Sequence, residues 1–265
     1  MCLSIALTCE ARANAMQPVI PIHEQRAAPQ AAMHSALPAK DSVNLSAETS
    51  TVTSRPLAPL QKLIVIGFMG GNVNASNTVH PEALLIKTLQ ESHPLAVHAA
   101  IFANRHGETA LKTILQFLDK DKDGHLSDDE KKAARIAIFG HSWGASETIW
   151  LSRKLNQLGI PVLLTVQVDS VQKRSQNDEE IPPNVHEAVN FYQSEGLLHG
   201  RSQIIATDPE KTKILGNYES SYRQNRVSCA GYPWYARAFM KRHIQIENDP
   251  AIWSRIEALI LAKIS

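Results

Sequence analysis

The chain has 265 residues, of which 43% are hydrophobic and 20% are charged, and its formal net charge at pH 7 is +1. This length suffices for one α/β domain whose core needs no disulfide or metal to hold it together. The near-neutral charge gives no electrostatic reason to expect nucleic acid or an anionic membrane as a partner, and no apolar run reaches the roughly 18 residues of a bilayer-spanning helix. We therefore expect neither a nucleic-acid partner nor a transmembrane segment.

The first part of the chain differs in composition from the rest. A short apolar run at residues 3–7, followed by Ala13-Asn14-Ala15, is typical of an export signal with a small-residue cleavage site. Residues 1–15 therefore predict a signal peptide and a secreted or periplasmic protein, although no Lys or Arg precedes the apolar run. A misassigned start or a disordered terminus is the alternative. Residues 16–59 are rich in Ala, Pro, Ser, Thr and Gln and predict a disordered leader, with the folded domain at 60–265.

Strand and helix patterns begin at residue 63. Apolar runs predict buried strands over residues 63–66 and 97–102, and helical spacing of apolar residues predicts helices over 81–92 and 109–118. The first strand runs directly into residues 67–71, a loop that contains three glycines. Glycine on both sides lets the backbone of such a loop turn its N–H groups inward.

Residues 119–130 match the twelve-residue calcium loop of EF-hand proteins. Gly124 stands at the sharp turn, Leu126 at the apolar position, and Ser127 could hold a bridging water. A helix is predicted before the loop, and residues 127–134 could begin a second one. The expected ligands are the oxygen donors at loop positions 1, 3, 5, 7 and 12: Asp119, Asp121, Asp123, the carbonyl of His125, and bidentate Glu130. We predict one bound Ca²⁺, with a solvated acidic loop as the alternative.

A second motif follows the calcium loop. Residues 136–139 predict a buried strand that ends at Gly-His-Ser-Trp-Gly, residues 140–144, and a helix is predicted over 143–158. A serine on a sharp strand-to-helix turn needs glycines two residues to either side, because neighbouring backbone passes close to it. The helix N-terminus favours the negative charge that builds up in acyl transfer. We interpret Ser142 as a nucleophile, with a chance match as the alternative.

Residues 138–145, Ile-Phe-Gly-His-Ser-Trp-Gly-Ala, resemble the nucleophile elbow of the α/β-hydrolases, particularly their lipase and esterase branches. The resemblance extends from about residue 60 to the C-terminus. It implies an α/β-hydrolase fold, a compact and mainly parallel sheet of about five to six strands with helices on both faces. It also implies a serine hydrolase that cleaves carboxylic esters through an acyl-enzyme.

The resemblance also implies an oxyanion hole. Its first donor would be the N–H of Trp143, directly after the nucleophile, and its second would come from the glycine-rich loop at the end of the first strand. Phe68 is our choice for that second donor, and Met69 is the runner-up. The family often has His where Ile66 stands, so the match is partial, and a plain glycine turn is the alternative.

A triad also needs an acid that orients the imidazole and stabilises its protonated form. The strand predicted over residues 162–168 ends at Asp169, which resembles the acid of those lipases that carry it after the strand following the nucleophile strand. The more common family position lies one strand later, where a strand predicted over 203–206 leads to Asp208. We favour Asp169, because the residues around Asp208 also read as an ordinary polar turn.

The base is expected to be a histidine that follows the acid, as the chain order of the resemblance implies. Only His186, His199 and His243 follow Asp169. His243 stands just ahead of the last predicted helix, which has Asp249 as a possible N-cap, and the family places its histidine loop there. We therefore choose His243, with a surface histidine as the alternative.

Between the two candidate acids, residues 172–201 contain a predicted helix over 189–195 and form either a cap over the site or a plain crossover. Aromatic residues become frequent after this segment and could line an acyl pocket or simply pack: Tyr218, Tyr222, Tyr232, Trp234, Tyr235 and Phe239.

The position of the calcium loop follows from topology. In a parallel sheet, the helix after a strand carries the chain back to the amino edge, where the next strand begins. The loop at 119–130 should therefore lie at the opposite end of the sheet from Ser142, which favours a structural rather than a catalytic ion.

Other functions remain open at this level. The same residues could cleave a thioester or an amide, transfer the acyl group to an acceptor other than water, or belong to a non-catalytic, calcium-stabilised binding protein. The expected partner is a small-molecule or lipid ester.

Overall fold

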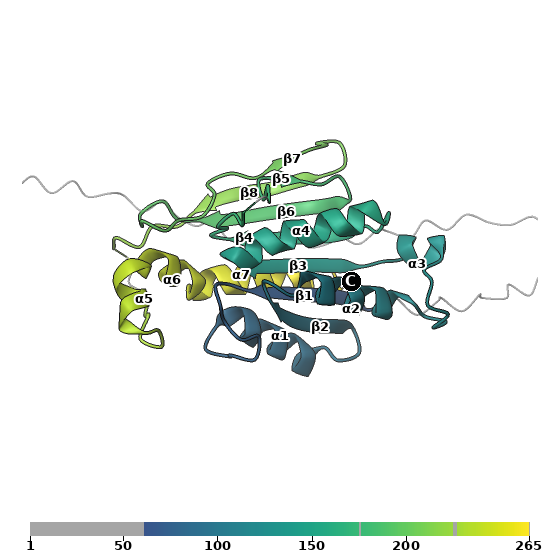
Figure 1. Ribbon diagram of the computed structural model, residues 1–265, viewed down its shortest axis with the longest axis horizontal. Coiled ribbons are helices and arrows are strands. Elements are labelled where there is room, and N and C mark those ends of the chain that lie inside the picture. The colour runs from purple at the N-terminus through teal and green to yellow at the C-terminus, as the bar shows by residue number, and fades with distance from the viewer. Residues whose placement is uncertain (1–60, 175, 225–226, 265) are drawn as a thin grey trace, which may run out of the picture. The chain divides into compact units, whose positions relative to one another are not determined.

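The computed structural model describes residues 61–174, 176–224 and 227–264. The predicted signal peptide and leader, residues 1–15 and 16–59, lie outside these ranges. Six strands form one parallel sheet in the order β2-β1-β3-β4-β6-β8, as Figure 1 shows. Their bounds are Leu63–Met69 for β1, Val97–Ala103 for β2, Ile136–His141 for β3, Val162–Val168 for β4, Val185–Tyr192 for β6 and Lys213–Glu219 for β8. The expected α/β-hydrolase fold, with a mainly parallel sheet, is confirmed.

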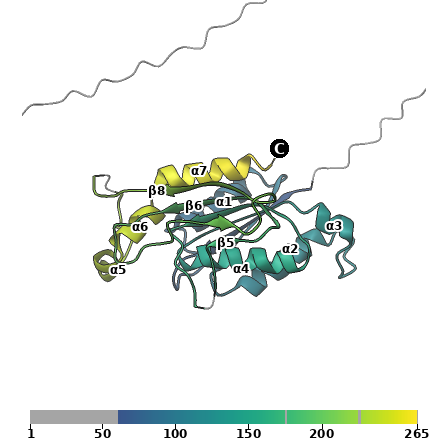
Figure 2. The ribbon, with the colours of Figure 1, turned by 90° about the horizontal axis from the view of Figure 1, so that it is seen from above.

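Helices cover both faces of this sheet (Figure 2). On one face α1 (Pro81–Ser92) and α7 (Pro250–Leu261) share an apolar core with the sheet, and on the other α2 (Gly107–Leu118) and α4 (Trp143–Gln157) share a second core. Strand β1 supplies both cores through its alternating side chains, because successive residues of a strand point to opposite faces. Leu63 and Val65 belong to the first core, and Ile64, Ile66 and Phe68 to the second.

The strand order places a crevice at one end of the sheet. The chain passes from β1 to β2 on one side and then returns to β3 on the other side of β1. Ligands of open α/β sheets bind outside the carboxyl ends of the strands at such a reversal of strand order. Both the glycine-rich loop after β1 and Ser142 after β3 lie at this point.

The segment between the candidate acids corrects one prediction. The prediction of a helix over residues 189–195 is wrong, because Val185–Tyr192 is strand β6, the neighbour of β4. Ala188, Val189 and Phe191 are buried in it. A strand covered on both faces shows a nearly continuous apolar run, and periodicity alone does not distinguish such a run from a buried helix.

The next strand of the sheet also differs from the prediction. Residues 203–206 contribute only β7 (Ile205–Ala206), which pairs with β5 (Glu180–Ile181) in a separate two-stranded sheet. The sixth strand of the main sheet is instead β8, at its edge. Most of its residues are half-exposed, so its sequence lacks the apolar pattern of the central strands.

The C-terminal elements agree with the prediction except around the expected histidine loop. Two short helices, α5 (Trp234–Phe239) and α6 (Lys241–Glu247), precede α7, and His243 lies in α6 rather than in a loop. Helix α7 begins as expected, since the side chain of Asp249 accepts a hydrogen bond from the N–H of Ala251 at 3.0 Å. No helix in the described part of the chain combines the length and apolar character needed to cross a membrane.

Two glycines permit the close packing around the end of β3. A Cβ atom added to Gly140 would lie 2.4 Å from the backbone carbonyl carbon of Gly144, and one added to Gly144 would lie 2.4 Å from the carbonyl oxygen of Phe68. Both obstacles are backbone atoms of the central strands and of α4. Neither can move aside as a flexible side chain would.

Replacing Gly140 with alanine is expected to lower the free energy of unfolding by about 1–3 kcal/mol, because the added methyl group overlaps this backbone. Gly231→Ala is the control, since the nearest atom there is Cγ1 of Val79 at 3.1 Å, and its expected effect is within about 0.5 kcal/mol. Urea denaturation followed by circular dichroism measures both variants. Equal losses in the two would contradict the packing argument.

Candidate active site

Ser142 lies on a strained turn between β3 and α4. Its backbone angles are φ 55° and ψ −123°, a conformation that costs a non-glycine residue about 1–3 kcal/mol and is typical of functional sites. The N–H of Ser142 donates to the carbonyl of Val168, the last residue of β4, at 2.9 Å. The turn is therefore fixed to the sheet while the serine side chain lines a cavity at the carboxyl ends of the strands.

Asp169 and His243 form a buried hydrogen bond. Nδ1 of His243 donates to Oδ2 of Asp169 at 2.7 Å, and neither residue is more than 5% exposed. Asp169 directly follows β4, also at a positive φ of 44°. Of the three histidines that follow Asp169 in the chain, His243 is the one that contacts it.

Further donors surround the Asp169 carboxylate. Its Oδ1 accepts from the N–H of Gly200 at 2.7 Å and from the N–H of Gln193 at 3.2 Å, and its Oδ2 accepts from Nε2 of Gln193 at 3.0 Å. Burial alone would raise the pKa of Asp169, but the hydrogen bond and charge of His243, together with these donors, hold that pKa below its ordinary value. The carboxylate is therefore ionised in the folded protein at neutral pH.

The alternative acid lies elsewhere. Asp208 follows β7 on a surface turn, where its carboxylate contacts Nζ of Lys211 at 3.0 Å. The strand next to β4 in the sheet is β6, and the first residue after it is Gln193, which donates to Asp169. The structure thus brings Asp169, and not Asp208, to His243.

A cavity of about 700 Å³ connects these groups, since Ser142, Trp143 and His243 all line it. Asparagine side chains of the loop after β1 contribute polar groups to its wall. The remaining wall is mainly apolar and includes Val73, Val79, Val171, Leu198, Tyr232, Tyr235, Met240 and Ile244. Such a space suits a small organic molecule with a substantial apolar part.

The aromatic residues of the last third of the chain fall into three groups. Tyr232 and Tyr235 line the cavity, whereas the side chains of Trp234 and Phe239 on α5 are 72% and 69% exposed. Tyr222 is buried in the first core. Only part of the predicted aromatic set therefore borders the site.

The two expected oxyanion donors differ in their placement. Trp143 is the first residue of α4 and lines the cavity. Phe68 is buried within β1, and its carbonyl faces Gly144 directly behind the serine turn. Gly70 lies beside Ser142, since a Cβ atom added to it would lie 3.3 Å from Cβ of Ser142. The segment 68–70 therefore runs alongside the serine.

A cluster of buried titratable side chains next to Asp169 and His243 was missed by the sequence analysis. It consists of His80, Glu82, His141 and Glu247, and we refer to it as the buried His/Glu cluster. The only sequence signal for it is that Glu247 follows His243 by four residues, one turn along the same helix. Burial lowers the pKa of His141 to about 4, and burial together with the charge of Glu247 raises the pKa of Glu82 well above its ordinary value.

The predicted calcium loop lies between α2 and β3, at the opposite end of β3 from Ser142 (Figure 1). Carboxylate oxygens of Asp119, Asp121 and Asp123 lie within 4.8 Å of one another, and the N–H of Gly124 donates to Oδ2 of Asp119 at 3.1 Å. Gly124 has φ 83°, as the sharp turn requires.

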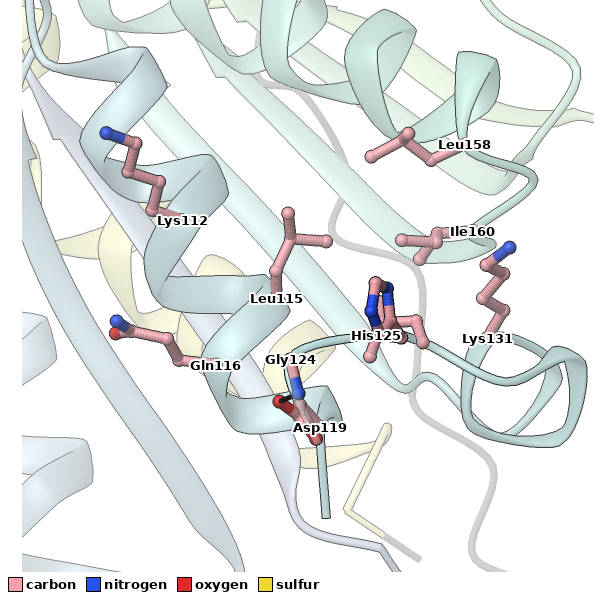
Figure 3. A pocket seen from close by; sticks show the side chains of 10 residues that line it. Lys112, Leu115, Gln116, Asp119, Gly124, His125, Lys131, Leu158 and Ile160 are labelled. Carbon is pink, nitrogen blue, oxygen red and sulfur yellow. Dashed lines mark hydrogen bonds between the residues drawn. The ribbon is translucent and has the colours of Figure 1, made fainter. Parts of the chain in front are cut away.

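Glu130, the last expected calcium ligand, accepts hydrogen bonds from backbone N–H groups instead of facing the three aspartates. The Glu130 carboxylate accepts from the N–H groups of Lys120 and Ser127 at 2.8 and 2.9 Å, and so closes the N-terminus of helix α3 (Asp128–Lys132). The side chain of His125 is exposed. A hollow of about 580 Å³ lies beside this loop. Figure 3 shows Leu158 and Ile160 on the side of it away from Asp119.

Comparisons with known proteins give only distant likenesses. No protein-family model matches the sequence, and no curated protein matches it. A solved arylesterase structure is 13% identical, with 77% of each chain covered and a TM-score of 0.41. An esterase from the archaeon Pyrobaculum calidifontis is 10% identical, with 78% of this chain and 79% of that chain covered and a TM-score of 0.39.

A thioesterase from the prodiginine pathway of Streptomyces coelicolor, RedJ, is also 10% identical, with 82% of this chain and 100% of that chain covered and a TM-score of 0.38. At such low identities and TM-scores, the function of this chain has to be argued from its own site.

Proposed function

We propose that the protein is a serine hydrolase that cleaves carboxylic esters through an acyl-enzyme. The observation that carries this proposal is the Asp169–His243 hydrogen bond at 2.7 Å beside a cavity that Ser142 also lines. These are the nucleophile, base and acid of a triad, in the chain order serine, acid, histidine.

Each residue of the triad has a definite role in the proposed reaction. Because Nδ1 of His243 donates to Asp169, its Nε2 is the nitrogen left to take the proton of Ser142 as the serine oxygen attacks the ester carbonyl. The ionised Asp169 stabilises the imidazolium that forms. The imidazolium then gives its proton to the departing alcohol, and water, activated by the same histidine, releases the acid from the serine.

The tetrahedral intermediate needs donors for its negative oxygen. Trp143 is the first residue of α4, so its N–H has no acceptor within that helix and lies at the helix's positive end. The second donor would come from the segment 68–70, with Phe68 still our choice from the resemblance. The contact of this backbone with Gly144 and with Ser142 supports the assignment to this segment.

We also propose a structural calcium ion in the loop at 119–130. Three carboxylates converge there, and Oδ1 of Asp119 is buried without a hydrogen-bond partner among the described residues. Binding would require Glu130 to leave the cap of α3 and turn both oxygens to the ion. An unpaired loop of this kind is expected to bind with a Kd of about 10⁻⁴–10⁻³ M, a range typical of extracellular modules.

Export through residues 1–15 stays a prediction.

The role of Ser142 can be tested with nitrophenyl esters of increasing chain length. Ser142→Ala is expected to lower kcat/KM more than about 10³-fold and to abolish labelling by a fluorophosphonate, because the attacking oxygen is lost. Ser152→Ala is the control, since that hydroxyl is buried in the same helix and donates to the carbonyl of Thr148 at 2.8 Å. A wild-type protein that takes no label would instead be a non-catalytic binding protein.

The choice of acid can be tested by two matched substitutions. Asp169→Asn is expected to lower kcat about 10³- to 10⁴-fold, because His243 loses the charge that orients and stabilises it, whereas Asp208→Asn leaves kcat unchanged. The reverse pattern would make Asp208 the acid.

The same pair predicts a pH dependence of stability. The pKa of Asp169 is lower in the folded than in the unfolded protein, so its charge contributes stability above the unfolded-state pKa, and this contribution is lost as the pH falls through the folded-state pKa. The difference in free energy of unfolding between wild type and Asp169→Asn should be largest at neutral pH and narrow below about pH 4. Urea denaturation across a pH series measures it.

The calcium site predicts stabilisation by the ion. At about 10 mM Ca²⁺ the free energy of unfolding is expected to rise by about 1.4–2.7 kcal/mol, the mass-action gain for the expected Kd. Asp121→Asn should remove most of this gain, and Asp129→Asn, which changes an exposed carboxylate of α3 outside the ligand set, should keep it. Thermal unfolding with calcium or magnesium is the measurement. Loss of activity on chelation with an unchanged Tm would contradict a structural role.

A further inference from the structure

The buried His/Glu cluster brings three separate parts of the chain together beside the serine turn. His80 and Glu82 lie at the start of α1, His141 is the last residue of β3, and Glu247 is the last residue of α6. Glu82 is completely buried, and no member of the cluster is more than 8% exposed. The proposed triad mechanism uses none of the four side chains.

Their nitrogen and oxygen atoms converge on one small volume. Nδ1 of His80 lies 2.5 Å from Oε1 of Glu247, and Nδ1 of His141 lies 3.6 Å from Oε1 of Glu82 and 3.6 Å from Oε2 of Glu247. One donor atom each from His80, Glu82 and Glu247 lies within 4.8 Å of the others. Ligands of one tetrahedral ion at bond lengths of about 2.0–2.2 Å lie about 3.3–3.6 Å apart, close to the two 3.6 Å separations of His141 from the carboxylates. The 2.5 Å between His80 and Glu247 is a hydrogen-bond distance, and an ion would have to replace that hydrogen bond.

Half of the cluster has no hydrogen-bond partner. Among the described residues, no side chain donates a hydrogen bond to the Glu82 carboxylate, and only the backbone N–H groups of Gly70 and Glu82 lie near it, outside good hydrogen-bond geometry. Both ring nitrogens of His141 are also buried without a partner among these residues. Such groups normally find partners, because burying them unpaired costs about 1–3 kcal/mol or more for each. Two buried carboxyl groups so close together are stabilised by a positive charge between them.

Side chains do not supply that charge in an obvious way. Within the described part of the chain, the ion pairs of Glu82 and Glu247 are formed by histidines alone. A bound cation would satisfy both carboxylates and give the ring of His141 a partner.

We propose that the buried His/Glu cluster binds one divalent transition-metal ion, for which zinc is the best fit. Two imidazoles and two carboxylates are a nitrogen and oxygen ligand set that Zn²⁺ takes in tetrahedral geometry, whereas Ca²⁺ and Mg²⁺ prefer oxygen alone. This site is distinct from the calcium loop, which lies at the other end of β3. The ion can enter from the cavity, because His80, His141 and Glu247 line it.

Further polar side chains lie beside the cluster. The hydroxyl of Tyr232 lies 3.2 Å from Nδ1 of His80 and accepts from Nδ2 of Asn248 at 3.0 Å. An ion bound to Nδ1 of His80 would replace this contact, and Tyr232 would then border the ion from the cavity wall.

The ion would position the proposed base rather than take part in the reaction. Glu247 and His243 lie one turn apart on α6, and the rings of His141 and His243 are 4.5 Å apart. An ion between α1, β3 and α6 would therefore fix the helix that carries His243 relative to the strand that carries the serine.

The test is metal binding by the full chain, purified without a histidine tag, freed of metal with a chelator and then titrated with zinc by calorimetry. We expect about one zinc per chain with a Kd in the micromolar range or tighter, a rise in Tm with zinc, and the visible absorption of tetrahedral Co²⁺ when cobalt replaces it. Glu82→Gln is expected to weaken zinc binding more than about 10-fold. Glu91→Gln, on the exposed face of the same helix, is the matched control and should bind as wild type does.

Several results would overturn the proposal. One is a wild-type protein that is folded by circular dichroism but shows neither zinc heat nor a shift in Tm. Another is a Glu82→Gln protein that is folded and binds zinc as tightly as wild type. Should that variant fail to fold, the cobalt spectrum of the wild-type protein decides, and only a tetrahedral spectrum supports the site. Asp121→Asn should leave zinc binding intact, which separates this ion from the calcium loop, and none of these readouts depends on ester hydrolysis.

Discussion

The contact between the backbone of Gly144 and the carbonyl of Phe68 is the constraint on which the rest of the site depends. No side chain separates helix α4 from strand β1 at this point, because both Gly140 and Gly144 lack a Cβ atom. The chain can therefore leave β3, turn sharply and enter the helix within a few residues. Ser142 takes its strained backbone conformation as a result, with its side chain in the cavity and the helix N-terminus beside it.

The Asp169–His243 hydrogen bond connects this turn to the C-terminal part of the chain. The two residues are 74 positions apart, and the carboxylate is held by donors from Gln193 and Gly200 as well as by the imidazole. An ionised carboxylate without these partners would be costly to bury. The same helix that presents His243 ends at Glu247, so the triad and the buried His/Glu cluster share one structural element.

Much of the fold could be predicted from local pattern. The strands at 63–66, 97–102, 136–139 and 162–168, and the helices that start at 81, 143 and 250, have strong apolar spacing or clear terminal residues, and the structure contains them all. The prediction failed for β6, which is buried on both faces, and for the edge strand β8, whose half-exposed residues carry no apolar period. Whether a strand is buried on one face or on both depends on the elements that pack against it, and the sequence of the strand alone does not reveal this.

The candidate site, like the fold, could be predicted only in part. The glycine spacing around Ser142, and acid and histidine positions implied by the family resemblance, identified residues that the structure brings to one place. The buried His/Glu cluster left almost no trace in the sequence, because its members come from positions 80, 82, 141 and 247 and meet only through the strand order. Polar residues scattered in this way look like ordinary surface residues until the fold assembles them.

Ser142 and Asp169 follow adjacent strands of the sheet, since His141 of β3 pairs with Val168 of β4. The proposed nucleophile and acid thus lie at the same level on a single pair of strands, joined by the hydrogen bond between Ser142 and Val168. The strands β5, β7 and β8 contribute no group to the proposed triad, whereas the loop between β6 and β7 supplies Gln193 and Gly200 to Asp169. Changes of sequence in β5, β7 and β8 are therefore compatible with an intact site, and changes of length in that loop are not.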